Sequence, residues 1–396
     1  MTRAARRYRV VVVVAARPNM MKAAPILAEM AKCPLLEALL VHTGQHYDYL
    51  MSRVFFEQLH LPEPVCNLEV GGGTHHTQTG EVIKRFGEYV QQARPDCVVV
   101  LGDVNATAAC ALVAAKEHIP VVHVESGLRS GDRTMPEEIN RIVTDSISDL
   151  LLVTERSGLE NLRREGIPSD RIVMTGNVMI DSLVRMLPLA ERSDVLARLG
   201  LQNRRYVLLT LHRPSNVDEE RHFLETMDAV ATLAATVPVI FPVHPRTGQQ
   251  LSELGFRRFT ALAEGMQPGP VGLWTMPPAP YLEFVALMNS AALVLTDSGG
   301  VQEETTFLRV PCLTFRENTE RPVTVEMGSN RLIGSDPGRL LRESLAALAE
   351  ERKPGTATPP LWDGQAAGRI VTAILALLEA ASRPATFSRG FTVAQS

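Results

Sequence analysis

Short apolar runs rich in valine, isoleucine and leucine recur along the chain, and polar or turn residues follow each of them. In the first half these runs are residues 10–16, 39–42, 97–101, 121–124 and 149–154. A short apolar run bounded by turn residues is typical of a buried strand. Helical segments such as 23–32 lie between the runs, and strands that alternate with helices predict a doubly wound parallel sheet.

The second half repeats this alternation. Its apolar runs are residues 206–211, 239–243, 273–276, 293–295 and 310–315. At 396 residues the chain exceeds one ordinary domain core. We therefore predict an α/β protein of two Rossmann-like domains, residues 1–185 and 186–365. A polar connection at 188–198 leads into the second domain, a helix at 366–381 packs back on the first domain, and a polar tail covers 383–396.

The stretch 293–305 combines a strand, a glycine turn and the start of a helix over 301–308. Gly299 and Gly300 in this turn would let a ligand approach the backbone closely. The N-terminus of the helix offers free N–H groups and a partial positive charge, and both suit a phosphate. The stretch therefore indicates a phosphate site.

Glu303 and Glu304 lie one turn into the same helix, where a carboxylate could reach a ribose hydroxyl. The alternative is an ordinary strand-to-helix connection with Asp297 or Ser298 as its cap. The stretch matches neither a GxGxxG fingerprint nor a Walker A loop. From these residues alone both interpretations stay open.

Composition narrows the class of protein. An apolar content of 45% and a charged content of 21% describe a globular protein, and a net charge of -4 argues against a general nucleic-acid binder. The five cysteines are scattered and never form a CxxC, so neither a disulfide framework nor a structural zinc site is expected. No segment approaches the length of a membrane span, and we expect a cytoplasmic protein.

Residues 71–78 contain three glycines and the pair His75–His76. Two adjacent histidines rarely face one ion, so a metal site is less well supported here than a plain loop. We interpret the segment as a mobile loop that could act as a lid.

Four titratable residues stand just after predicted strands or at a helix start: Asp103, Glu125, Glu137 and His212. Carboxylates serve as acids or bases where burial or neighbouring charge tunes their pKa. As alternatives, Asp103 could cap a helix, Glu137 could form a capping box with Thr134, and His212 could be a surface histidine. Glu125 has no capping role and is the most suggestive of the four.

Two cations follow the first predicted strand. Arg17 and Lys22 would stand near its carboxyl end, where open α/β sheets bind ligands. The alternative is that both are solvated surface cations.

In combination these motifs resemble the non-hydrolysing UDP-N-acetylglucosamine 2-epimerases, over about residues 9–381. The matching motifs are, in order, ARPNMMK (16–22), TGQH (43–46), LGD (101–103), HVESGLR (123–129), MPEEINR (135–141), TGN (175–177), HR (212–213), PVH (242–244), TDSGGVQEE (296–304) and NTERP (318–322). The resemblance implies a GT-B-like fold with two domains facing across a cleft, a homodimer, and an isomerase that needs neither NAD nor a metal.

The resemblance also implies site residues. Those that match the diphosphate site are Ser298, Gly299, Gly300 and Arg17, with Arg321 near it. Glu304 matches the ribose ligand, Phe284 the ring that faces uracil, and His244 a position lining the same cleft. Those that match the surroundings of the sugar are Lys22, Asp103, Glu125, Glu137 and His212.

The implied reaction is an elimination followed by re-addition. UDP leaves C1 while a base removes the C2 proton, and UDP then adds back to 2-acetamidoglucal with protonation on the other face. A closed site would retain the glycal, and cations near the diphosphate would stabilise the leaving group. The sequence does not assign a carboxylate to either face.

The chain departs from the family at Tyr47–Asp48, where bacterial members continue with an Arg and a further Gln that bind an activating second substrate molecule. Ser126 also stands where Ala is usual, and the segment between Gly131 and Pro136 is shorter. Activation by substrate is therefore not expected. The competing functions are a hydrolysing epimerase, an epimerase of a modified UDP-HexNAc, a GT-B glycosyltransferase and a UDP-sugar binder without turnover.

Overall fold

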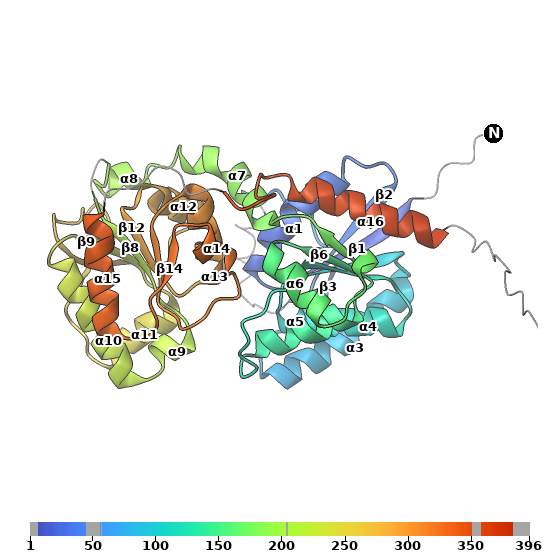
Figure 1. The fold of residues 1–396 in the computed structure, drawn as a ribbon, viewed down its shortest axis with the longest axis horizontal. Helices are drawn as coiled ribbons and strands as arrows, with labels where there is room; N and C mark the ends of the chain where they lie inside the picture. The colour runs from blue at the N-terminus through green and yellow to red at the C-terminus, as the bar shows by residue number, and fades with distance from the viewer. Residues whose placement is uncertain (1–6, 45–55, 57, 203–204, 351–357, 383–396) are drawn as a thin grey trace, which may run out of the picture.

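The computed structural model describes residues 7–44, 56, 58–202, 205–350 and 358–382, without the side chain of Arg17. Two parallel sheets of seven strands lie side by side in two lobes (Figure 1). Every strand pair in both sheets is parallel. The predicted α/β architecture with two doubly wound sheets is confirmed.

The first sheet has the order β3-β2-β1-β4-β5-β6-β7. Its strands are β1 (Tyr8–Val14), β2 (Leu36–His42), β3 (Cys66–Asn67), β4 (Cys97–Leu101), β5 (Val121–Ser126), β6 (Leu150–Val153) and β7 (Ile172–Met174). The helices of this part of the chain are α1 (Arg17–Met30), α3 (His75–Ala93), α4 (Asn105–Lys116), α5 (Pro136–Ile147), α6 (Arg156–Arg164) and α7 (Val178–Ala190), with a 3₁₀ turn at Ser169–Arg171.

The second sheet has the order β10-β11-β9-β8-β12-β13-β14. Its strands are β8 (Val207–Thr210), β9 (Pro238–Pro242), β10 (Thr260–Ala261), β11 (Gly272–Met276), β12 (Leu293–Thr296), β13 (Cys312–Thr314) and β14 (Asn330–Leu332). The remaining helices are α8 (Val195–Arg198), α9 (Pro214–Val217), α10 (Glu220–Ala234), α11 (Pro245–Glu253), α12 (Tyr281–Ser290), α13 (Gly299–Leu308), α14 (Val323–Glu326), α15 (Pro337–Ala349) and α16 (Ala366–Ser382).

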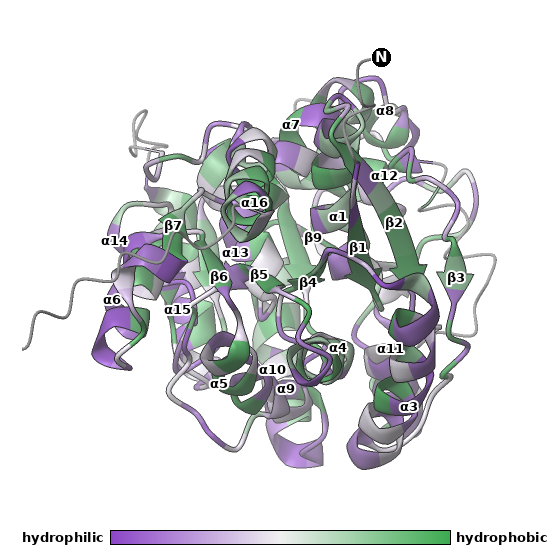
Figure 2. Ribbon diagram, turned by 90° about the vertical axis from the view of Figure 1, so that its right-hand side faces the viewer, coloured by the Kyte–Doolittle hydropathy of each residue, from purple (hydrophilic) through white to green (hydrophobic). Residues whose placement is uncertain are grey.

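Burial explains why the strands read as unbroken apolar runs. The central strands β1 and β4 are covered by helices on both faces, and every residue of β4 is buried. Figure 2 shows β1 and β2 as strongly hydrophobic, whereas the outer helices alternate polar and apolar residues. A parallel sheet covered on both faces needs apolar side chains at every position rather than at alternate ones.

The last helix returns to the first lobe. α16 packs against α1 and α7 and lies over the first sheet in Figure 1. Asp181 of α7 caps its N-terminus, since the Asp181 carboxylate accepts hydrogen bonds from the N–H groups of Ala366 at 3.0 Å and Ala367 at 2.7 Å. The indole of Trp362 donates to the Thr154 carbonyl at 3.2 Å. These contacts fix the direction in which the chain enters α16.

One segment prediction was wrong. The loop expected at 71–78 ends at Thr74, whose side chain caps α3, so His75 and His76 are helical. The polar connection expected at 188–198 contains the last residues of α7, which runs to Ala190, and the short helix α8. The boundary predicted at residue 185 falls inside α7, and the division into domains stays a prediction. The predicted tail 383–396 lies outside the described residues.

None of the helices in the described ranges combines the length and the apolar character that a membrane span requires.

Candidate active site

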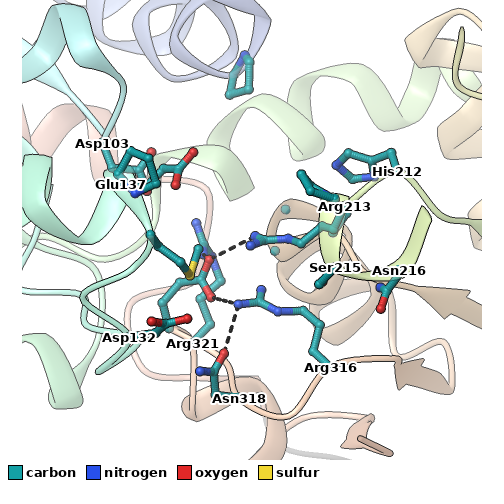
Figure 3. A pocket seen from close by; sticks show the side chains of 18 of the residues that line it. Asp103, Asp132, Glu137, His212, Arg213, Ser215, Asn216, Arg316, Asn318 and Arg321 are labelled. Atoms are coloured by element: carbon teal, nitrogen blue, oxygen red, sulfur yellow. Dashed lines mark hydrogen bonds and ion pairs between the residues drawn. The ribbon is translucent and has the colours of Figure 1, made fainter. Parts of the chain in front are cut away.

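A cavity of about 1170 Å³ lies between the two lobes, at the carboxyl ends of their strands. This is the edge at which open parallel sheets bind ligands. Figure 3 shows Asp103 and Glu137 on one side and His212 and Arg213 on the other. The predicted site residues that line it are Lys22, Asp103, Glu125, Glu137, His212, Ser298, Gly299, Gly300 and Arg321.

Glu125 lies inside a strand, not after one. β5 continues to Ser126, and its pairing with β6 shifts register between Val124 and Ser126. Glu125 is the bulge residue, with φ at +71°, a conformation rarely adopted by a residue with a side chain. Only 3% of Glu125 is exposed, although it lines the cavity. A strained, buried carboxylate at a bulge is a common feature of functional sites.

Two cations hold the Glu125 carboxylate. Lys22 Nζ lies 2.5 Å from Oε2, and Arg321 Nη2 lies 3.1 Å from Oε1. Burial alone would raise the pKa of Glu125, but Lys22 and Arg321 outweigh it and lower the pKa below its usual value. Glu125 is therefore an ionised carboxylate that bridges the two lobes through Arg321.

Neither capping alternative for the other carboxylates is correct. α4 begins after Val104, and the Asp103 carboxylate instead accepts from Arg141 Nη1 at 3.0 Å. Met135 precedes α5 without a side-chain cap, and the Thr134 hydroxyl donates to Asp132 rather than pairing with Glu137. Asp103 and Glu137 both line the cavity, which leaves them available for acid–base chemistry.

Asp297 orients His212 in the second lobe. Its Oδ1 lies 2.9 Å from His212 Nδ1, and its Oδ2 accepts from the backbone N–H groups of His212 at 2.9 Å and Arg213 at 2.8 Å. Burial raises the pKa of Asp297, but the hydrogen bond from His212 outweighs it and the pKa is lowered. With Nδ1 facing this carboxylate, Nε2 is the ring nitrogen that can exchange a proton with a ligand. The sequence suggested only a cap for Asp297.

The glycine turn gives a ligand room at the start of α13. Ser298 precedes the helix in an extended conformation, and its N–H donates to Thr296 Oγ1 at 3.0 Å. A Cβ on Gly299 would lie 2.8 Å from Arg321 Nη1, whereas a Cβ on Gly300 would meet no described atom within 4 Å. Gly300 thus exposes backbone at the edge of the cavity.

Three arginines surround one carboxylate at the cavity wall. Glu320 accepts from Arg213 at 3.4 Å, from Arg316 at 2.9 Å and from Arg321 at 3.1 Å. Burial raises the pKa of Glu320, but the arginines outweigh it and the pKa is strongly lowered. Arg316 Nη1 is buried and has no partner among the described residues. Three guanidinium groups beside one carboxylate give this wall a surplus of positive charge that suits a phosphate.

Arg213 and Arg316 were missed from the sequence, although a usable signal was present. Both follow a strand of the second sheet within a few residues, which is the rule that selected His212. Glu303 was considered but not selected, and it lines the cavity and accepts from Arg321 Nε at 2.6 Å.

Four predicted residues are not placed at the cavity wall. Glu304 accepts from the Tyr281 hydroxyl at 2.7 Å, and burial raises the pKa of Glu304 to about 7. Phe284 is half-buried against an apolar cluster of α7, α8 and α12. His244 precedes α11, and its ring lies 5.7 Å from that of His212. Arg17 begins α1, but its side chain lies outside the described part of the structure.

A site of this architecture agrees with the comparisons with known proteins. A model of the family described as UDP-N-acetylglucosamine 2-epimerase matches residues 28–375. The chain belongs to this family of epimerases. A UDP-N-acetylglucosamine 2-epimerase of Methanocaldococcus jannaschii is 39% identical over 365 residues, which are 91% of this chain and 97% of the relative.

A UDP-2,3-diacetamido-2,3-dideoxy-D-glucuronate 2-epimerase of Pseudomonas aeruginosa is 37% identical over 345 residues, 86% of this chain and 93% of the relative. Among solved structures, the M. jannaschii UDP-GlcNAc 2-epimerase in complex with UDP-GlcNAc and UDP has a TM-score of 0.83 at 38% identity. It covers 93% of this chain and 99% of its own. The chain is thus an epimerase, an isomerase with a GT-B-like fold, and its relatives carry the names of more than one sugar.

Among the described residues, no three His, Cys, Asp or Glu side chains form a group that could hold a metal ion.

Proposed function

We propose that this epimerase interconverts UDP-GlcNAc and UDP-ManNAc. The observation that supports it best is the arrangement of carboxylates and cations in one cavity. Asp103, Glu125 and Glu137 come from the first lobe, and the glycine turn and Arg321 come from the second. A binding protein would not need three carboxylates beside the sugar of a nucleotide that is already doubly negative.

The reaction proceeds by elimination and re-addition. The C2 hydrogen is not next to a carbonyl group, so its direct removal is difficult. When UDP leaves with the electron pair of the C1–O bond and a base takes the C2 proton, a C1–C2 double bond forms. UDP then adds back at C1 while C2 is protonated on the opposite face. Two acid–base groups on opposite faces of the ring are therefore required.

The residues divide between the two halves of the substrate. The Ser298–Gly300 turn, Arg321 and Arg17 hold the diphosphate and stabilise the charge that develops on the leaving group. Lys22 and the three carboxylates surround the sugar, and His212 lies at the border between the two halves. Glu304, Phe284 and His244 bind the nucleoside half of the substrate. Glu304 and Phe284 reach it once substrate binding rearranges the contacts of α12 and α13.

The substrate is the point on which the family is divided. The P. aeruginosa relative is named for a diacetamido glucuronate, while the M. jannaschii relative is named for N-acetylglucosamine. The slightly higher identity and coverage of the second support UDP-GlcNAc for this chain.

NMR of the chain with UDP-GlcNAc in D2O tests the proposal. We expect UDP-ManNAc to appear with deuterium at C2, since the proton is lost to a solvent-exchanging base. Equal amounts of free ManNAc and UDP would show hydrolysis instead. Tight UDP binding with no exchange would show a binder, and turnover only of the diacetamido glucuronate would reassign the substrate. Asp170→Asn, on a surface turn outside the cavity, is the matched control for carboxylate variants.

We further propose a homodimer in the cytoplasm. The family resemblance supports the dimer, and sedimentation of the purified chain tests it. The five cysteines, all free in the structure, are typical of a reducing compartment.

A further inference from the structure

A histidine behind the candidate active site has both ring nitrogens on oxygen acceptors. His123 lies in β5, two residues before Glu125, and is fully buried. Its Nδ1 lies 2.6 Å from Asp145 Oδ1, and its Nε2 lies 2.8 Å from the carbonyl oxygen of Gly102. The sequence alone suggested no role for His123.

Donor and acceptor chemistry fixes the protons on this ring. A carbonyl oxygen can only accept, so Nε2 carries a hydrogen. Asp145 also accepts from Gly127 N at 3.0 Å and from Arg129 Nη2 at 2.8 Å. Burial raises the pKa of Asp145, but His123 and Arg129 outweigh it and the pKa is lowered. Arg129 alone is a reason for this carboxylate to be ionised, because its guanidinium group is always charged and lies 2.8 Å from Oδ2. Nδ1 must then carry a hydrogen too.

We propose that His123 is a buried imidazolium, paired with Asp145, that positions the catalytic carboxylates Asp103 and Glu125. One end of the pair holds the carbonyl of Gly102, the residue before Asp103. The other end holds the N–H of Gly127, two residues after Glu125. The inference rests on the proposed function for the roles of Asp103 and Glu125. It adds positioning residues that do not themselves line the cavity.

The geometry shows why a charged pair is needed rather than simple packing. Gly102 and Gly127 both have positive φ, at +64° and +80°, so the backbone turns sharply on either side of the two carboxylates. Hydrogen bonds from both ring nitrogens and to both Asp145 oxygens brace these two turns against each other. A neutral side chain in place of His123 can make at most some of these hydrogen bonds.

The imidazolium also acts on Glu125 through its charge. The charged groups that face Glu125 are Lys22 from α1, Arg321 and Glu303 from the second lobe, and His123 from its own strand. His123 adds to the lowering of the Glu125 pKa that Lys22 and Arg321 cause. Its removal should raise that pKa, so that Glu125 becomes protonated at a higher pH.

The protonation state is tested on the wild-type chain without substrate. Histidine labelled with ¹⁵N, with the signal assigned by its loss in His123→Gln, should show hydrogens on both ring nitrogens at the pH of the activity assay. A ring nitrogen without a hydrogen would overturn the imidazolium. This readout needs no turnover, so it decides this part even if the proposed reaction fails.

The positioning role is tested with His123→Gln and Asp145→Asn. Displacement of a catalytic group by about 1 Å can cost about 100-fold in rate, so we expect kcat to fall by at least about tenfold. KM and the Kd for UDP should stay within a few-fold, because the Ser298–Gly300 turn lies on the other lobe. The acid limb of kcat/KM should move to higher pH in His123→Gln.

His76→Gln, an exposed histidine on α3, is the control and should change none of these values. A fall in kcat with an unmoved pH profile, or equal losses in kcat, UDP affinity and melting temperature, would show a merely structural role and overturn the proposal.

Discussion

Arg321 and Glu125 form an ion pair across the two lobes, with Nη2 3.1 Å from Oε1 and a separation of 196 positions in the sequence. The same guanidinium group contacts Glu303 at 2.6 Å and Glu320 at 3.1 Å. Three carboxylates of the protein thus occupy the cation that would meet the substrate diphosphate. Binding of UDP-sugar would therefore compete for Arg321 and change the surroundings of Glu125.

Removing the charge of Glu125 should affect both turnover and stability. Glu125→Gln should lower kcat by at least about 100-fold, as expected for loss of an acid–base group. It should also lower the free energy of unfolding, because a broken buried ion pair costs about 3–5 kcal/mol. Measured turnover and the midpoint of urea unfolding check the two effects. The effect on stability is expected because Lys22 is buried against this carboxylate and would lose its charged partner.

The double variant Lys22→Met with Glu125→Gln separates these effects. It leaves no unpaired lysine, so it should regain part of the lost stability while remaining inactive. A single Glu125→Gln variant that turns over within a few-fold of the wild-type rate would exclude Glu125 as the base.

Gly300→Val should weaken UDP binding with little change in stability. A Cβ at this position meets no described atom within 4 Å, so it has open space at the edge of the cavity, where the side chain would keep phosphate oxygens from the backbone. Gly80→Val is the control for an open position on a helix away from the cavity. Calorimetry with UDP measures both, and equal UDP affinity in Gly300→Val and wild type would remove this turn from the site.

Substrate should draw the two lobes together. Closure would exclude water and retain the glycal. Small-angle scattering should give a smaller radius of gyration with UDP than without it. Gly300→Val at the same UDP concentration should give the ligand-free curve, whereas identical curves for the wild type with and without UDP contradict closure.

A glycine near the proposed imidazolium should be sensitive to substitution. Gly127 has φ at +80°, and a Cβ there would lie 2.4 Å from the Gly158 carbonyl oxygen. Gly127→Ala combines left-handed strain with overpacking and should cost about 2–5 kcal/mol. Gly131→Ala has a similar φ of +76° with open space around it, so it should cost only about 1–2 kcal/mol. Urea midpoints for the pair test the difference, and equal midpoints would show that the Gly127 backbone moves to admit the methyl group.

The strands and the edge of the sheets that carries the site could be predicted from apolar runs, because a parallel sheet buried on both faces leaves a continuous hydrophobic signal. The bulge at Glu125 could not, since a register shift depends on β6 and not on the residues of β5 alone. Likewise, Asp297 lies against His212 only because β8 and β12 are neighbours in the sheet. Hydrophobic periodicity predicts the helices and strands, whereas contacts between elements distant in sequence can be known only once the fold is known.

Two helix boundaries differ from those that the sequence favoured. Three glycines before Thr74 favoured a loop, but the Thr74 cap starts α3 at once. Pro188 favoured a break, but the apolar face of α7 packs against α1 and α12, and this packing carries the helix through its last turn. A local cap decides the first case, whereas tertiary contacts outweigh a weak local preference in the second.

Glu155, a carboxyl that the proposed reaction does not use, should make stability fall as pH rises. It is 3% exposed, accepts from the Ser157 hydroxyl at 2.7 Å, and has one oxygen without a partner among the described residues. Burial, with a further contribution from Glu303, raises the pKa of Glu155 from 4.5 to about 7. Between these values the folded chain keeps a proton that the unfolded chain releases, so stability declines by up to about 3 kcal/mol and then levels off.

Glu155→Gln is neutral at every pH and should remove this decline. The stability of the variant relative to the wild type should therefore increase between pH 5 and pH 8, by up to the same amount, because only the wild-type side chain must be buried as a charge at pH 8. Urea unfolding at the two pH values measures this difference, in which the pH dependence of all other groups cancels. An equal difference for Glu155→Gln at pH 5 and pH 8 would mean that Glu155 ionises in the folded chain as readily as in the unfolded one, through water or a local opening between the lobes.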